Sequence, residues 1–99
     1  MKLTDKDLLS LAAKAIGGAF DAPTESITLD GGIEYTQWNP LEDDGDAFSL
    51  ATDLHMMVNF AAAAAIAYYD KGLASGSISD PSPHRAIVRA AAAIGSLMP

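Results

Sequence analysis

The sequence predicts a small α/β (α+β) domain in which three helices accompany three to four strands. Three observations support this class. Apolar residues recur at helical spacing near both ends of the chain and again after residue 43, and an Asp-Gly step separates two β-rich runs. A short apolar run at residues 56–60 then precedes an alanine-rich, aromatic segment. The length of 99 residues limits the chain to one domain, 1–99.

Residues 4–17 are predicted to form the first helix. Thr4 followed by Asp7 is a T-x-x-D capping signal, and an acidic first turn suits the positive end of the helix dipole. Gly17 and Gly18 end the helix, since glycine readily takes the left-handed conformation that closes it. The apolar stripe consists of Leu8, Leu9, Leu11, Ala12, Ala15 and Ile16.

A β-hairpin is predicted over residues 27–38. The runs Ile27–Leu29 and Ile33–Trp38 flank Asp30-Gly31-Gly32, and an Asp-Gly step between β-rich runs is a strong hairpin signal. Residues 19–26, which precede the hairpin, are expected to form a loop.

A second helix is expected after the strand break at Asn39-Pro40. Asp43 or Asp44 can cap this helix, which then extends to about Leu54. Acidic residues crowd its first turn, the end of a helix that favours negative charge. Its buried face is expected to hold Ala47, Phe48, Leu50, Ala51 and Leu54.

The second half of the chain begins with a predicted short strand, Met56–Phe60. For residues 61–70 alanine propensity indicates a helix, whereas Tyr68-Tyr69 and the flanking turn signals allow a strand. We expect a strand for part of this run, because alanine in a central strand would let a helix approach the sheet closely. Residues 75–79 are predicted to be a loop or a short edge strand.

The last helix is predicted to begin after Ser79-Asp80-Pro81 or Ser82-Pro83, since each offers a cap followed by proline at the first helical position. Its apolar stripe consists of Ile87, Val88, Ala91, Ala92, Ile94 and Met98. Alanines at 61–67 and 90–93 also present small faces that permit close subunit packing. A core with so many small side chains would gain stability from the apolar area that oligomerisation buries, so we expect a homo-oligomer.

The charge of the chain is unevenly distributed. The net charge is −7, made up of −8 over residues 1–53 and +1 over residues 54–99. This balance argues against direct nucleic-acid binding and against binding to anionic membranes. The absence of cysteine excludes disulfides and thiolate chemistry. The charged N-terminus is unlike a signal peptide, and no apolar segment is long enough to span a bilayer.

The segment Trp38-Asn39-Pro40-Leu41 with Asp43-Asp44-Gly45-Asp46-Ala47 resembles the W-N-P-L-x-D-D-G-D-A motif of small bacteriophage proteins with the phage ABA sandwich domain. Those proteins also end in an arginine-bearing, alanine-rich helix similar to residues 84–93. The resemblance follows the order of elements over most of the chain. It implies a three-layer helix–sheet–helix sandwich and a phage or prophage origin, and therefore the cytoplasm of an infected bacterial host. It supplies no catalytic residues.

The most suggestive binding chemistry lies at the start of the last helix. Arg85 and Arg89 are one helical turn apart, and guanidinium groups suit phosphate oxygens. The competing interpretation is that both arginines pair with the abundant carboxylates of the chain. Trp38 has two interpretations as well, a ring that stacks on a planar ligand or a plug at one end of the core. The candidate ligand-binding residues are Arg85, Arg89, His84, Lys71, Tyr68, Tyr69 and Trp38.

No catalytic or metal-binding motif is present in the sequence. The acids Glu42, Asp43, Asp44 and Asp46 could hold Ca²⁺ or Mg²⁺, but they fail the EF-hand template and suit a capped helix start better. There is no nucleophile elbow, P-loop or zinc-protease motif. We therefore expect no enzymatic activity, no metal and no cofactor.

Three functions are compatible with these features. The first is a phage accessory protein that binds and sequesters a small phosphate-bearing ligand, such as a host nucleotide immune signal, in order to counter host defence. The second is an acidic inhibitor that binds a host nucleic-acid-binding or defence protein. The third is a phage structural or accessory protein of unassigned role.

Overall fold

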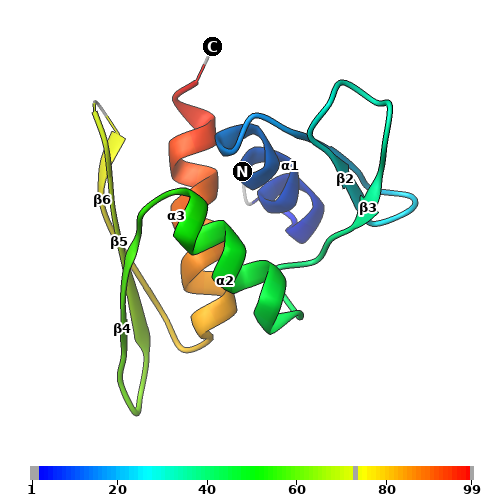
Figure 1. Cartoon of the computed structure of the whole chain (residues 1–99). Helices are drawn as coiled ribbons and strands as arrows, with labels where there is room; N and C mark the ends of the chain where they lie inside the picture. The colour runs from blue at the N-terminus through cyan, green and yellow to red at the C-terminus, as the bar shows by residue number, and fades with distance from the viewer. Residues whose placement is uncertain (1–2, 73, 99) are drawn as a thin grey trace.

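Three helices lie between two small antiparallel sheets (Figure 1). The computed structural model describes residues 3–72 and 74–98. The helices are α1 (Asp5–Ala15), α2 (Asp44–Asp53) and α3 (Pro83–Ser96). One sheet has the order β1-β2-β3, with strands Ala19–Asp21, Ser26–Thr28 and Thr36–Gln37. The other has the order β4-β5-β6, with strands Met57–Phe60, Ala65–Lys71 and Ala74–Asp80.

The predicted α+β class and the three helices are confirmed. The described residues form six strands where three to four were expected, partly because residues 19–21, expected to be a loop, pair with β2. The layer order also differs from the expected helix–sheet–helix sandwich, since the helices lie together between the sheets (Figure 1). The outer face of the β4–β6 sheet is not covered by a helix, and along β6 it carries the exposed residues Ser75, Ser77 and Ser79. None of the described helices is both long and apolar enough to cross a bilayer.

Local hydrogen bonds fix both ends of α1, as its sequence predicts. The Thr4 hydroxyl accepts from the Asp7 amide at 3.2 Å, and the Asp7 carboxylate accepts from the Thr4 amide at 3.0 Å. The bond from the Thr4 amide, together with the Thr4 side chain, holds the pKa of the Asp7 carboxyl below its usual value. Gly17 has a φ of 79°, and the amide of Gly18 donates to the Ala13 carbonyl at 2.9 Å. This Schellman arrangement ends the helix where glycine removes the steric penalty of a left-handed residue.

The predicted hairpin is present, but its connection is longer than a tight Asp-Gly turn. Strands β2 and β3 pair through Ser26↔Gln37 and Ile27↔Thr36, which leaves residues 29–35 as the loop. One oxygen of Asp30 organises this loop, because it accepts from the Thr28 hydroxyl at 2.8 Å and from the amides of residues 33 and 34 at 3.1 and 3.0 Å. The same bonds lower the pKa of the Asp30 carboxyl.

Alanine brings α3 close to the central strand of the larger sheet. Ala65 and Ala67 of β5 are buried against Ala86 and Ala90 of α3, and all four are at most 1% exposed. The strand predicted for part of the alanine run is confirmed, with residues 61–64 forming the turn before it. Ala65, Ala67 and Ala90 therefore pack within the chain, and the expected homo-oligomer stays a prediction.

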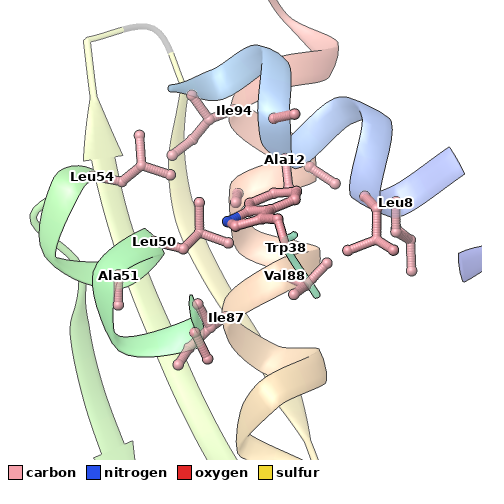
Figure 2. Packing of buried hydrophobic residues seen from close by; sticks show 14 of the residues in the cluster. Leu8, Ala12, Trp38, Leu50, Ala51, Leu54, Ile87, Val88 and Ile94 are labelled. Atoms are coloured by element: carbon pink, nitrogen blue, oxygen red, sulfur yellow. The ribbon is translucent and has the colours of Figure 1, made fainter. Parts of the chain in front are cut away.

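The main core lies where all three helices meet. Leu50 of α2 and Val88 of α3 are almost fully buried, and Trp38 lies between the helices with only 8% of its surface exposed (Figure 2). The Trp38 ring also packs on Phe20 of β1, with 6.0 Å between the ring centroids. The tryptophan therefore joins the small sheet to the helices.

Candidate functional site

The two arginines of α3 are paired with carboxylates of their own chain. Arg85 donates to Asp5 at 2.9 Å, and Arg89 donates to Asp80 at 3.1 Å. The hydrogen bond to Asp5, together with the charges of Asp5 and Asp80, raises the pKa of Arg85. Both guanidinium groups keep part of their surface exposed, so these are surface ion pairs of small net stability. The intramolecular interpretation of the arginines is the one that the geometry supports.

His84 points away from the arginines, toward the first turn of α2. Its Nε2 lies 2.6 Å from Oδ1 of Asp44, which brings the N-terminal ends of α2 and α3 together. The Asp44 carboxylate is 93% exposed, so this contact is open to solvent and to any molecule that competes for His84.

The other candidate residues do not converge on the arginines. Lys71 lines a shallow hollow with Ile94, which lies roughly 13 Å along the helix axis from Arg85. Tyr68 and Tyr69 are consecutive in β5 and face opposite sides of the sheet, as the two-residue repeat of a strand requires. Trp38 is buried in the core and is not free to stack on a ligand. These residues therefore do not share one pocket in the structure, and their role in ligand binding stays a prediction.

A deep hollow lies between α2, β4 and the start of α3, and we call it the α2–β4 groove. Its volume is 790 Å³. Phe48 and Phe60, which are 73% and 69% exposed, lie on its walls, and His84, Asp44 and His55 line it as well. The remaining lining residues are Ala47, Ala51, Thr52, Met56, Val58, Pro83 and Ile87.

The sequence did not identify this groove. Phe48 was assigned to the buried face of its helix, and that assignment is wrong. The residues Ala47, Leu50, Ala51 and Leu54 already complete the buried stripe of α2, and Phe48 lies 100° beyond Ala47 around the helix. This surplus aromatic residue is the one signal in the sequence that points to the groove. The contribution of β4 could not be foreseen without the tertiary structure.

Most acids of the Trp38–Ala47 motif have local structural roles. Asp43 caps α2 by accepting from the Asp46 amide at 2.8 Å. Asp46 in turn accepts from the Asn39 amide at 2.8 Å, which ties the strand break to the helix. Among the described residues, no group of three or more acids and histidines is placed to hold a metal ion. The motif therefore builds a turn and a helix start.

Comparisons of the chain with family models, with curated proteins and with solved structures found no match. The resemblance to phage ABA sandwich proteins accordingly stays a prediction from the Trp38–Ala47 segment.

Proposed function

We propose that this chain is a phage or prophage accessory protein that binds and sequesters a small ligand without transforming it. The α2–β4 groove is the binding site in this proposal, and its exposed aromatic walls are the observation that carries it. The resemblance of the Trp38–Ala47 segment supports the phage origin and a place of action in the host cytoplasm. Sequestration requires tight binding alone, which suits a site that lacks an activated nucleophile.

The size and lining of the groove fit a small organic molecule. Ligand pockets typically measure about 300–1,000 Å³ and combine apolar walls with a few polar groups. Phe48 and Phe60 offer flat apolar surface to a planar ring, such as a nucleobase. Thr52 lines the same groove, but its hydroxyl donates to the Phe48 carbonyl at 2.7 Å, so His84 does not activate it.

The His84 end of the groove favours an anionic group on the ligand. His84 is in the first turn of α3, where the helix dipole attracts negative charge. The Asp44 carboxylate occupies this position in the structure, 2.6 Å from His84. A ligand phosphate is expected to displace this exposed carboxylate, which makes the proposed ligand a nucleotide-type molecule. Arg85 and Arg89, engaged with Asp5 and Asp80, have no direct role in this binding mode.

Isothermal titration calorimetry tests the proposal with cyclic nucleotides, ADP-ribose derivatives and the matching nucleosides that lack phosphate. Binding of at least one phosphate-bearing compound is expected, with weaker binding of its nucleoside. Phe48→Ala should weaken binding about ten-fold, because stacking of a base on an aromatic ring contributes roughly 1–3 kcal/mol. No binding of any compound in the panel would refute the proposal.

Two control variants separate this groove from the rest of the surface. Tyr35→Ala removes another exposed aromatic residue, outside the groove, and should leave the affinity unchanged. The double change Arg85→Ala and Arg89→Ala should also leave it unchanged. If this pair abolished binding while Phe48→Ala did not, the ligand site would lie at the arginines instead.

A second candidate, an acidic inhibitor of a host protein, is favoured by one observation. Glu42 and Asp44 are both exposed near the start of α2, and the Asp44 side chain is 93% exposed. This candidate predicts salt-sensitive capture of a basic host protein. The combined change Glu42→Gln and Asp44→Asn spares the structural acids Asp43 and Asp46. Undiminished capture by that variant would count against the inhibitor.

A further inference from the structure

The free edge of β6 lacks the features that normally prevent one sheet from pairing with another. β6 pairs with β5 over seven consecutive residues, without a bulge, and lies at the edge of its sheet. Its sequence, ASGSISD, contains neither lysine nor proline, the usual protective residues of edge strands. Within residues 3–72 and 74–98, no backbone group outside the sheet hydrogen-bonds to the backbone of β6. The Arg89 guanidinium donates to the Ser79 carbonyl at 3.5 Å and to the Asp80 carboxylate at 3.1 Å, at the C-terminal end of the strand.

We propose that β6 pairs antiparallel with β6 of a second copy of this chain, which joins two three-stranded sheets into one sheet of six strands. A two-fold axis at Ser77 would place Ser77 opposite its own copy. It would place Ser75 opposite Ser79, and Gly76 opposite Ile78. The last pair sets the smallest residue of the strand against its largest, which leaves room for Ile78 beside the paired backbone. Such an isologous contact is the commonest way in which proteins form homodimers.

Charge favours a second copy as the occupant of this edge. Two chains of net charge −7 repel each other over most of their surface, but residues 74–79 carry no charge. Asp80, which ends the strand, is paired with Arg89 at 3.1 Å and would stand opposite Ala74. No like charges therefore face each other across the proposed axis. An uncharged edge also offers nothing that would select a basic or an acidic peptide as partner.

The neighbouring surfaces are compatible with this pairing. Along β6 the outer face of the sheet carries exposed serines. These small side chains would continue across the proposed two-fold axis without a steric clash. The α2–β4 groove adjoins β4, the opposite edge of the same sheet, so both copies would keep the groove open. The proposal is thus independent of ligand binding in the groove.

Sedimentation velocity of the full chain over a concentration series tests the pairing. The parent protein should show a concentration-dependent monomer–dimer equilibrium. Ser77→Lys should raise the dimer dissociation constant about five-fold or more, because it places like charges directly opposite each other. Ser75→Lys adds the same charge to the same face of the same strand, but opposite Ser79, and should have little effect. Circular dichroism melts establish that each variant is folded.

A mixing experiment isolates the proposed axis. Ser77→Lys and Ser77→Asp chains should each dimerise poorly alone and should form a heterodimer when combined, since opposite charges then face each other. A parent chain that stays monomeric throughout the series would overturn the proposal. Equal effects of Ser75→Lys and Ser77→Lys, or no heterodimer in the mixture, would overturn it as well. Loss of the dimer in Phe48→Ser but not in Ser77→Lys would place the interface in the α2–β4 groove instead.

Discussion

Gly95 of α3 lies at the closest approach of two packed helices. A Cβ atom at this position would lie 2.0 Å from the carbonyl oxygen of Leu11 in α1 and 2.9 Å from its carbonyl carbon. Both are backbone atoms, so no side-chain movement can relieve the overlap. Glycine is therefore required here by the contact between helices, although alanine would suit the helix itself better.

Gly95→Ala is expected to lower the free energy of unfolding by about 1–3 kcal/mol, because α1 and α3 must move apart. Urea unfolding followed by circular dichroism measures the change. Gly45→Ala in α2 is the matched control, since its Cβ would come no closer than 3.2 Å, to a side-chain oxygen. The control should alter stability by less than about 1 kcal/mol. Unchanged or increased stability of Gly95→Ala would contradict the close helix contact.

Asp30 should contribute stability that depends on pH. Its hydrogen bonds hold the carboxyl pKa below the ordinary value of 3.8 in the folded chain. Stability from such a group is present above its unfolded pKa and is lost as pH falls through the folded pKa. Asp30→Asn should therefore be less stable than the parent at about pH 7, and the difference should shrink at about pH 3. Urea unfolding at the two pH values measures it, and an equal difference at both would contradict this role.

At the scale of elements, helix α2 shows how a run of acids serves structure. Its N-cap is Asp43, and the Asp46 carboxylate holds the preceding strand break at Asn39. Both carboxylates lie at the positive end of the helix dipole. The acids that first suggest a metal or a partner site thus stabilise the start of a helix, and Asp44 alone reaches out to another element.

Asp43→Ala is expected to lower the free energy of unfolding by about 1 kcal/mol, because the Asp46 amide loses its acceptor. Asp43→Asn keeps an acceptor oxygen at the same place and should lower the free energy of unfolding much less. Thermal unfolding of the two variants provides the comparison. A loss for asparagine as large as that for alanine would show that the charge of Asp43, rather than its hydrogen bond, stabilises α2.

The sequence predicted the elements that carry strong local signals. α1, α2 and α3 begin at the capping residues Thr4, Asp43 and Ser82, all of which lie within the predicted starts. β1 and the full length of β6 were not predicted, because short or serine-rich strands are stabilised by pairing with their neighbours and carry little signal of their own. The strand β5 could be foreseen only in part, since alanine itself favours a helix.

At the scale of the molecule, alanine and glycine set the distances between layers. Small residues on α3 face β5 on one side and α1 on the other, so one helix is packed closely by both neighbours. Trp38 supplies the bulk that the alanines lack, at the junction of the small sheet and the helices (Figure 2). The larger sheet is consequently covered on one face only, and its outer face and the β6 edge are open.

For the candidate site residues, the sequence indicated the chemistry and the tertiary structure decided the contacts. The sequence singled out Arg85, Arg89 and His84 as an unusual basic group in an acidic chain, and it also offered pairing with carboxylates as the alternative. It could not choose, because Asp5 and Asp44 are 80 and 40 residues away from their partners in the chain. Only the tertiary structure shows that Arg85 pairs with Asp5 of α1 and that His84 contacts Asp44 of α2.

The sequence by itself determined the class of the protein, its three helices and their caps, because these depend on contacts within a few residues. It also determined that the Trp38–Ala47 segment is a strand break followed by a capped helix. The tertiary structure alone decided the order of the layers, the pairing of the cations and the location of the α2–β4 groove. Each of these depends on contacts between distant segments, which backbone geometry and close packing fix only when all the elements are assembled.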